Sequence, residues 1–521
     1  MIGAERHRRG SAPRIASFVL LSAVLSSLIA LTWNGGVRDP QVVHFGDDAD
    51  YILTTQSFVN HRSPEARVED LYSSVAQLPR RWRAAIQRRY QDWPAPSYYR
   101  DNYGRYYNWH FWTYGAYTAL FKAPLDRKQR GAGAFALANT VAFCAALVAL
   151  LQLWTLPRVW PLFVPLAFFT PLLWFLPLAH TEPFVFSLLL IAAACQLRRR
   201  YLLATLCSAL AATQFQPLTL LAGLSVGQGL WTQFKLRLSG WSRVGRALWV
   251  VVALGAFALS FAPSLFYYRN YGVTSLIARQ GFAASKLMSF DKFRSMFIDL
   301  DTGMITYMPG LLLVLLYCAV LVVQRSHAAR SLRVLLPWAV VLAALWSTTS
   351  ALNWNYHTQG VSRYVLYCTP ALLLLVGVEL RARPPRALTL AVFALAFALQ
   401  IQVHRSFGWL KFEGDNSLHH NVVASYVLRH WPSLYRAPGE IFCSRTLRRR
   451  CVLDRNTGLV AADELPVVYF DVDGRPRKAL AYGCASKRLL GARAWSEAEA
   501  ARIRRALHPC RPGRLSYIDF D

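Results

Sequence analysis

Three carboxylates lie close together near the start of the chain. Asp47, Asp48 and Asp50 fall within four residues, in the stretch from His44 to Tyr51. Acids are scarce in this chain, which has 28 Asp and Glu against 58 Lys and Arg. A positioned carboxylate can act as a general base and take a proton from an attacking hydroxyl group. The cluster is therefore a candidate catalytic centre, with Asp47 or Asp48 as the base.

Other residues that could do chemistry stand at the ends of apolar runs later in the chain. Histidine exchanges protons near neutral pH, and arginine offers a planar array of donors that matches the oxygens of a phosphate. Together with a carboxylate base, these side chains suit an acceptor hydroxyl and a departing phosphate. The candidates for holding the phosphate-bearing reactant are His110, His180, Glu182, Arg269, Arg363, Tyr356 and His357.

Each candidate also has a structural role open to it. Asp is a favoured N-cap, so Asp47 can begin the helix predicted by the apolar periodicity that follows it. Asp48 shares the face of Tyr51, whereas Asp50 lies off that face and is expected to be solvated. The histidines can bond to backbone, Glu182 can cap a helix, and the arginines can anchor helix ends at lipid headgroups. The choice between Asp47 and Asp48 as the base stays open.

The composition indicates which elements must position these residues. Of the 521 residues, 54% are hydrophobic and 17% are charged, where soluble domains average about 25% charged. Mean hydropathy is +0.24, and several apolar runs approach the ~20 residues of a membrane-spanning helix. The formal charge of +30 comes from basic residues in the short gaps between these runs, which is typical of cytoplasmic loops. We expect a polytopic α-helical membrane protein that contacts membrane lipids and binds no nucleic acid.

The same charge rule predicts the topology. With the basic N-terminus inside, residues 34–130 form a long outer loop, and every candidate residue lies at the outer face. A basic segment with aromatic residues around 81–93, and the short apolar segment 111–125, are expected to be interfacial helices of this loop. About eleven spans are expected, at 15–33, 131–155, 160–178, 183–197, 201–215, 217–233, 247–267, 304–324, 333–351, 363–380 and 386–404. Gln214, Gln216 and Pro217 interrupt the apolar pattern between 201 and 233.

The tail, residues 405–521, is polar and charged and is expected to be a small extracytoplasmic α/β domain. It contains Cys443, Cys451, Cys484 and Cys510. Four cysteines outside the cytoplasm permit two disulfides. Of the three possible connectivities we favour pairing of nearest neighbours, Cys443–Cys451 and Cys484–Cys510. A zinc site is disfavoured because the tail has no Cys-x-x-Cys spacing.

The order of these motifs resembles the C-type glycosyltransferase (GT-C) superfamily, which includes the protein O-mannosyltransferases, the lipid A aminoarabinose transferase and the mycobacterial arabinosyltransferases. The resemblance covers residues 10–405. It rests on the acidic pair, the aromatic-His motif at 106–112, the His/Glu-Pro turn at 180–183 and the Gly-x-x-Arg-Tyr motif at 360–364. It implies an inverting, metal-variable transfer with Asp47 as the preferred base and Asp48 as an orienting acid or metal ligand. The family's His-Pro-Pro or Lys-Pro-Pro loop end appears here as His110-Phe111-Trp112, which leaves the role of His110 open.

The expected function follows from these points. Nucleotide sugars are not normally available outside the cytoplasm, so an activated sugar must arrive on a lipid carrier. We expect the domain 1–404 to be a glycosyltransferase, similar to arabinosyl- or mannosyltransferases, in a bacterial inner membrane with its site on the periplasmic side. Arg269 and Arg363 would hold the phosphate of a polyprenyl-phosphate sugar, and Asp47 would deprotonate a hydroxyl of a glycan, lipid or protein acceptor. No cofactor is certain, and a divalent metal at Asp48 is open.

Two other classes of protein remain as alternatives. One is a polysaccharide ligase or polymerase that uses a diphosphate-linked donor, and the other is a transporter or flippase of lipid-linked sugars. A transporter is expected to carry its ionisable groups near the middle of the bilayer, whereas here they gather at one face.

Overall fold

A computed structural model describes the protein, which is mostly helical. The described residues are 12–34, 47–76, 93–95, 97–127, 131–153, 160–235, 243–323, 328–352, 354, 360–382, 387–409, 418–448, 451–454, 458–461, 467–473, 475–482, 495–506 and 515–520. Tyr356, His357, Cys484 and Cys510 lie outside them, as does most of the basic segment predicted around 81–93.

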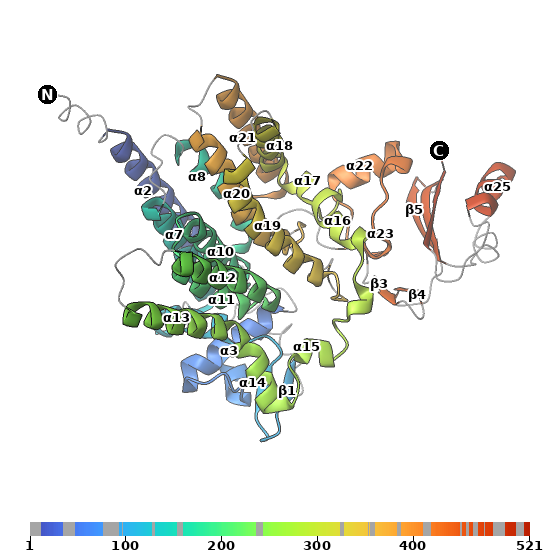
Figure 1. Cartoon of the computed structure of the whole chain (residues 1–521). Helices are drawn as coiled ribbons and strands as arrows, with labels where there is room; N and C mark the ends of the chain where they lie inside the picture. Colours follow the sequence, from blue (N-terminus) through green and yellow to red (C-terminus); the bar gives the residue numbers. More distant parts are fainter. Residues whose placement is uncertain are drawn as a thin grey trace.

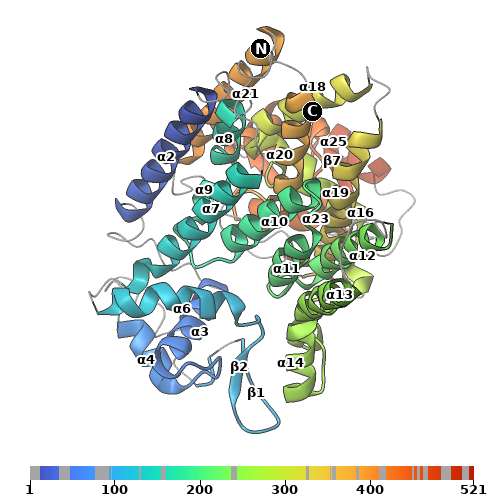
Figure 2. The same ribbon diagram turned by 60° about the vertical axis from the view of Figure 1, so that its left-hand side comes forward.

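Helix α10 (Glu182–Leu197) lies at the centre of the helical body. It packs against α7 (Ala134–Leu153), α11 (Tyr201–Ala212) and α20 (Val365–Ala382), and Figure 2 shows it between these neighbours. Beyond its first residue α10 is apolar apart from Ser187 and Gln196, and a helix that is apolar on nearly all sides is typically buried. Its polar first residue, Glu182, therefore stands at the edge of an apolar core.

The other helices of the body complete this core. Helix α18 packs on α21, and α19 packs on both α20 and α12. Their bounds, with those of the remaining helices, are α2 (Ala12–Thr32), α8 (Trp160–Phe168), α9 (Leu172–Phe175), α12 (Thr219–Lys235), α13 (Arg243–Ala258), α14 (Ala262–Tyr271), α15 (Leu276–Arg279), α16 (Phe290–Ile298), α17 (Met304–Tyr307), α18 (Pro309–Val323), α19 (Ala328–Thr348) and α21 (Ala387–Phe407).

Within the described residues, two stretches of helix are long and apolar enough to cross a membrane. They are Ala247–Tyr271, which joins most of α13 to α14, and Ala387–Phe407, which is α21. Each of the other predicted spans coincides with at least one helix, although the segment predicted at 160–178 is divided between α8 and α9. Several are short: α11 has 12 residues, about 18 Å of helix against a hydrocarbon core of about 30 Å. The chain is compatible with insertion in a membrane, and the number of crossings stays a prediction.

The predicted outer loop begins with α3 (Asp47–His61), which packs against α4 (Val68–Ala76) and α6 (Thr113–Asp126). The α3–α6 contact is close, because a Cβ on Gly115 would lie 2.9 Å from Cγ2 of Thr54. A two-stranded antiparallel hairpin, β1 (Tyr98–Arg100) and β2 (Tyr106–Asn108), lies beside these helices. Figure 2 shows α3, α4, α6 and the hairpin grouped at one end of the helical body, next to α14.

The described part of the tail combines helices with antiparallel strands, and its being a separate domain stays a prediction. Figure 1 shows it to one side of the helical body, beyond α16. Its elements are α22 (Val422–His430), α23 (Gly439–Leu447), the hairpin β3 (Cys451–Asp454) and β4 (Gly458–Ala461), the sheet β5 (Val467–Val472), β6 (Arg475–Tyr482) and β7 (Leu515–Asp519) in the order β5-β6-β7, and α25 (Glu497–Ala506). Buried residues of α22 and α23 belong to the same apolar cluster as those of α10 and α20, so this part of the tail is packed on the body.

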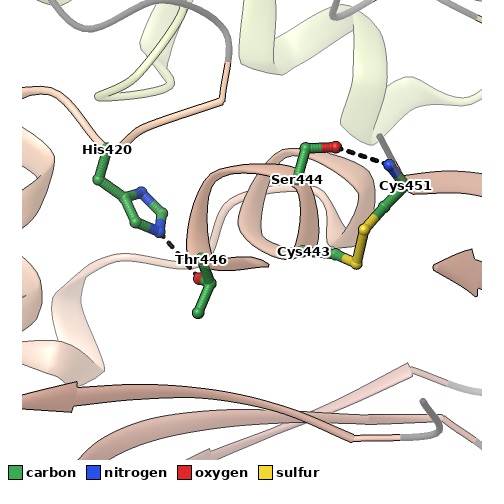
Figure 3. Close-up of a disulfide and its surroundings, with 5 residues drawn as sticks. All are labelled: His420, Cys443, Ser444, Thr446 and Cys451. Carbon is green, nitrogen blue, oxygen red and sulfur yellow. Dashed lines mark hydrogen bonds between the residues drawn. A yellow bond between two sulfur atoms is a disulfide. The ribbon is translucent and has the colours of Figure 1, made fainter. Parts of the chain in front are cut away.

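A disulfide joins Cys443 in α23 to Cys451, the first residue of β3. Figure 3 shows the bond and the backbone amide of Cys451 donating to Oγ of Ser444 at 3.0 Å. This is the pairing favoured above, and the Cys484–Cys510 pairing stays a prediction.

Candidate functional site

The first turn of α3 brings the acidic cluster into the structure. Asp47 is the first residue of the helix, and Asp48 and Asp50 follow in the same turn. The backbone amides of a first turn have no partners within the helix, and the helix dipole favours negative charge there. The sequence therefore places carboxylates where the backbone helps to stabilise them, which agrees with the predicted helix start.

Arg363 bridges two acids that are far apart in the sequence. Its Nη1 donates to Oδ2 of Asp47 at 2.5 Å, and its Nε lies 3.7 Å from Oε1 of Glu182. Arg363 comes just before α20, and Glu182 begins α10, so the packing of these two helices fixes the distance between them. The side chains of Asp47 and Arg363 are 16% and 15% exposed, so solvent screens the pair only partly.

His180 forms a second bridge between acids. Its Nε2 lies 2.7 Å from Oδ1 of Asp48, and its Nδ1 lies 3.2 Å from Oε2 of Glu182. Burial disfavours the charged imidazole, but the carboxylates of Asp48 and Glu182 outweigh burial and hold the pKa of His180 well above its ordinary value. His180 therefore holds Asp48 between the two helices' ends, whereas Asp47 lines the cavity described below.

Asp47 is more accessible than Asp48, with 16% of its side chain exposed against 1%. Burial alone would raise its pKa, but Arg363 and His110 outweigh burial and hold the pKa of Asp47 well below its ordinary value. The Nε2 atom of His110 lies 3.5 Å from Oδ1 of Asp47, and the His110 ring packs on Tyr51 at 5.2 Å between centroids. Asp47 is thus a carboxylate with one oxygen toward Arg363 and the other toward His110.

Asp50 is buried, so the prediction from the sequence that its side chain is solvated is wrong. It is only 2% exposed, and the hydroxyl of Tyr98 donates to its backbone carbonyl at 2.8 Å. The expectation assumed that α3 buries a single face, but residues from Asp48 to Ser57 are all buried because α4, α6 and β1 enclose the helix. An amphipathic pattern read from one helix cannot reveal partners on its other sides.

The side chains of Asp47, Asp50 and His110 also form the group best placed to hold a metal ion. One ligand atom from each lies within 4.8 Å of the others, and carboxylate oxygen with imidazole nitrogen suits several divalent metals. Asp48, the acid considered for a metal above, is not part of this group and is bound to His180 instead. A metal here would have to share Asp47 with Arg363.

A cavity of about 360 Å³ opens beside this charge cluster. Asp47, His110, Glu182 and Arg363 line one part of it. Most of the remaining lining comes from aromatic and small polar side chains: Tyr51, Trp109, Phe111, Thr181, Thr213, Gln214, Phe215, Gln216, Pro217, Pro263, Tyr267, Ser275, Ile277, Phe282, Ala283, Ser347, Thr348, Ser350, Ala351, Tyr364 and Tyr367. Charged groups on an aromatic wall suit a ligand that has both a polar reacting centre and an apolar body.

Arg269 does not belong to this cavity. It is exposed on α14 and lines a separate hollow with Arg105, on the side of α14 away from Tyr267, which does line the cavity. The structure therefore does not bring Arg269 into the cavity with Arg363, and their predicted partnership on one phosphate stays a prediction.

Residues between α11 and α12 belong to the site but were not among the candidates. Gln214 and Gln216 line the cavity, and Nε2 of Gln214 donates to the carbonyl of Phe111 at 3.1 Å. The signal was present in the sequence, because these two glutamines and Pro217 interrupt an apolar stretch. The interruption predicts a boundary between the spans 201–215 and 217–233, but irregular backbone within a membrane is also tolerated where it lines a cavity.

A second buried polar cluster joins the body to the tail. Asp301, in the loop after α16, accepts from the backbone amide of Asn421 at 2.8 Å and from the hydroxyl of Tyr435 at 2.9 Å, and its Oδ2 lies 2.7 Å from Nδ1 of His420. The Tyr435 hydroxyl also lies 3.0 Å from Oδ2 of Asp299. Because the partners are more than 110 positions apart, no local pattern in the sequence could have found this cluster.

No family model, no curated protein and no solved structure matches the chain.

Proposed function

We propose that the chain is a membrane glycosyltransferase that moves a sugar from a polyprenyl-phosphate donor to a hydroxyl of an extracytoplasmic acceptor, with inversion at the anomeric carbon. The observation that carries the proposal is the pairing of Asp47 with Arg363 at the wall of a partly aromatic cavity. A base and a phosphate-binding cation must lie close together for this reaction, because the attacked carbon carries the leaving phosphate.

The residues have distinct roles in the proposed reaction. Asp47 takes the proton of the acceptor hydroxyl as its oxygen attacks the anomeric carbon. The bond between that carbon and the phosphate oxygen breaks, and the bonding pair leaves with polyprenyl phosphate, whose charge Arg363 stabilises. His180 and Glu182 keep Asp48 and Arg363 in position, at 2.7 Å and 3.7 Å respectively. A divalent metal held by Asp47 and Asp50 would supply additional charge to the leaving phosphate.

The proposed setting is a bacterial inner membrane crossed by about eleven helices. The end of the body that carries α3, α6 and the β1–β2 hairpin would face the periplasm, together with the tail 405–521. The lipid carrier would then reach the cavity from the outer leaflet. The Cys443–Cys451 disulfide supports this orientation, because disulfides persist in the periplasm and are rare in the cytosol.

The charge of the cavity favours a monophosphate-linked donor over a diphosphate-linked one. Arg363 is the single Lys or Arg side chain among the described residues that line the cavity. Its charge is already paired with the carboxylates of Asp47 and Glu182. A diphosphate brings more negative charge and would call for further cations or a metal. A ligase or polymerase with a diphosphate donor is therefore the second candidate.

Single acid-to-amide substitutions test the proposal. The purified protein in lipid nanodiscs would be offered a panel of polyprenyl-phosphate sugars, mannose and arabinose included, with glycan, lipid and peptide acceptors. We expect Asp47→Asn to reduce transfer by about 10²–10⁴-fold, the contribution of a positioned general base. Asp291→Asn is a matched control, because Asp291 is 73% exposed on α16. Full activity of both Asp47→Asn and Asp48→Asn would refute the assignment of the site.

A further inference from the structure

A second hollow, of about 540 Å³, lies between the β1–β2 hairpin and α14. Its lining consists of Tyr103, Arg105, Tyr107, Phe266, Arg269 and Asn270, and we refer to it as the Arg105–Arg269 hollow. Two arginines and several aromatic rings therefore face one small space. Figure 2 shows the hairpin and α14 as neighbours at the end of the body that also carries α3.

Arg105 is held in one orientation before any ligand binds. Oδ2 of Asp101 accepts from its Nε at 3.1 Å and from its Nη2 at 2.9 Å, and Nη2 also donates to Oδ1 of Asn270 at 3.1 Å. The rings of Tyr103 and Tyr107 lie 5.1 Å and 5.5 Å from the guanidinium carbon. No hydrogen bond joins its Nη1 to any residue that the structure describes. A guanidinium fixed in this way loses little conformational entropy when it binds an anion.

Arg269 adds a second positive charge to the hollow. It is exposed, and it forms neither an ion pair nor a hydrogen bond with the described part of the chain. Among the described residues, two guanidinium groups and no carboxylate line the hollow, while Asp101 and Glu65 act on Arg105 from outside the lining. An anion such as phosphate suits this hollow, because its oxygens can accept hydrogen bonds from both arginines at once and balance the excess positive charge.

The position of the hollow indicates where the anion comes from. The stretch Ala247–Tyr271 is long and apolar enough to cross a membrane, and only 17% of its apolar window is buried. A row of exposed apolar residues at helical spacing, Leu254, Phe261, Leu265 and Tyr268, runs along it and ends beside Arg269. Such a surface suits lipid chains, and an arginine with aromatic residues at its end lies at the depth of lipid headgroups.

We propose that the Arg105–Arg269 hollow binds the phosphate group of a membrane lipid, as a site separate from the Asp47 cavity. Nη1 of Arg105 and the guanidinium of Arg269 donate to the phosphate oxygens, while the lipid chains lie along the exposed row from Leu254 to Tyr268. The lipid is either an anionic phospholipid of the bilayer or a polyprenyl phosphate, since both present the same group at this depth. The site does not depend on glycosyl transfer.

Native mass spectrometry of the full-length protein in detergent tests this site without any turnover. The protein would be titrated separately with phosphatidylglycerol, with polyprenyl phosphate, and with diacylglycerol as a lipid without phosphate. We expect the wild type to bind one molecule of a phosphate lipid, and Arg269→Gln to bind it at least tenfold more weakly. Diacylglycerol should bind weakly to both proteins. Arg294→Gln is the matched control, because Arg294 is 48% exposed beside the exposed Asp291, and it should bind like the wild type.

The outcomes separate the two sources and can overturn the proposal. A loss confined to phosphatidylglycerol identifies a bulk phospholipid, and a loss confined to polyprenyl phosphate identifies the carrier. Arg269→Lys, which keeps the charge but not the planar donor array, should recover part of the affinity. Equal binding of all three lipids, or no loss in Arg269→Gln relative to Arg294→Gln, overturns the proposal. Arg269→Gln should fold normally, since Arg269 has no partner in the described residues.

Discussion

Replacing Arg363 with methionine should destabilise the folded protein far more than an ordinary surface substitution does. Arg363 lies between the carboxylates of Asp47 and Glu182, at 2.5 Å and 3.7 Å, and its side chain is only 15% exposed. Methionine fills a similar volume without charge, so the change removes the cation and leaves the two acids facing each other. His110 stays 3.5 Å from Asp47, and His180 is already shared between Asp48 and Glu182.

The magnitude follows from the burial of the pair. Removing one partner of a buried ion pair costs about 3–5 kcal/mol because the remaining charge is desolvated and unpaired. Removing Asp47 as well, in Arg363→Met/Asp47→Asn, should restore part of this loss. Groups in contact typically show a coupling free energy of about 0.5–3 kcal/mol, and we expect the upper part of this range for Asp47 and Arg363.

The assay is reversible unfolding in mixed micelles, followed by tryptophan fluorescence, for the wild type, both single variants and the double variant. The pair Arg294–Asp291 provides a matched control, because it joins the same residue types at 3.6 Å but is 48% and 73% exposed. Arg294→Met should cost less than about 1 kcal/mol, as exposed pairs do. If Arg363→Met and Arg294→Met lower the free energy of unfolding equally, Arg363 and Asp47 do not behave as a buried ion pair and the description is wrong.

Three further predictions concern the tail and the helix packing. Burial and the neighbouring Asp301 raise the pKa of Asp299 to about 6. Its contribution to stability is therefore present below about pH 4 and lost as pH rises through about 6, and Asp299→Asn should remove this dependence in hydrogen exchange of the tail. Replacing Cys443 and Cys451 with serine should destabilise the tail by about 2–3 kcal/mol. The tail should unfold at a lower denaturant concentration than in the wild type, and a reducing agent should no longer change that midpoint. Gly310→Ala should cost about 1–3 kcal/mol in denaturant unfolding, because its Cβ would overlap a backbone carbonyl of α21, whereas Gly227→Ala meets nothing within 4 Å and should be tolerated.

The ionisable residues beside the cavity could be predicted from the sequence because each lies at the end of an apolar run, next to a polar segment. Asp47, His180, Glu182 and Arg363 all occupy such ends, and helices packed side by side bring their ends together. Arg269 meets the same description, but it lies on the opposite side of α14 from the cavity. The end of a helix can be predicted from composition, whereas the direction in which its last side chains point depends on neighbours that the sequence does not identify.

The fold was predictable to a similar degree. The apolar runs predicted where the helices lie, because the position and length of each run can be read directly from the sequence. They did not reveal that α22 and α23 pack into the main core, nor that Asp301 bonds to His420 at 2.7 Å and to the backbone of Asn421. These contacts join segments more than 100 residues apart and depend on side-chain complementarity. The disulfide Cys443–Cys451 was within reach because only eight positions separate its cysteines.

The identity of the released lipid tests the proposed function most directly. Purified protein would be incubated with polyprenyl-phosphate and polyprenyl-diphosphate sugars and an acceptor, and the lipid products would be separated and quantified. We predict that polyprenyl monophosphate appears in equal amounts with the transferred sugar, and that Asp47→Asn slows its appearance by about 10²–10⁴-fold. Release of polyprenyl diphosphate, or transfer of sugar at an unchanged rate by Asp47→Asn, would contradict the account.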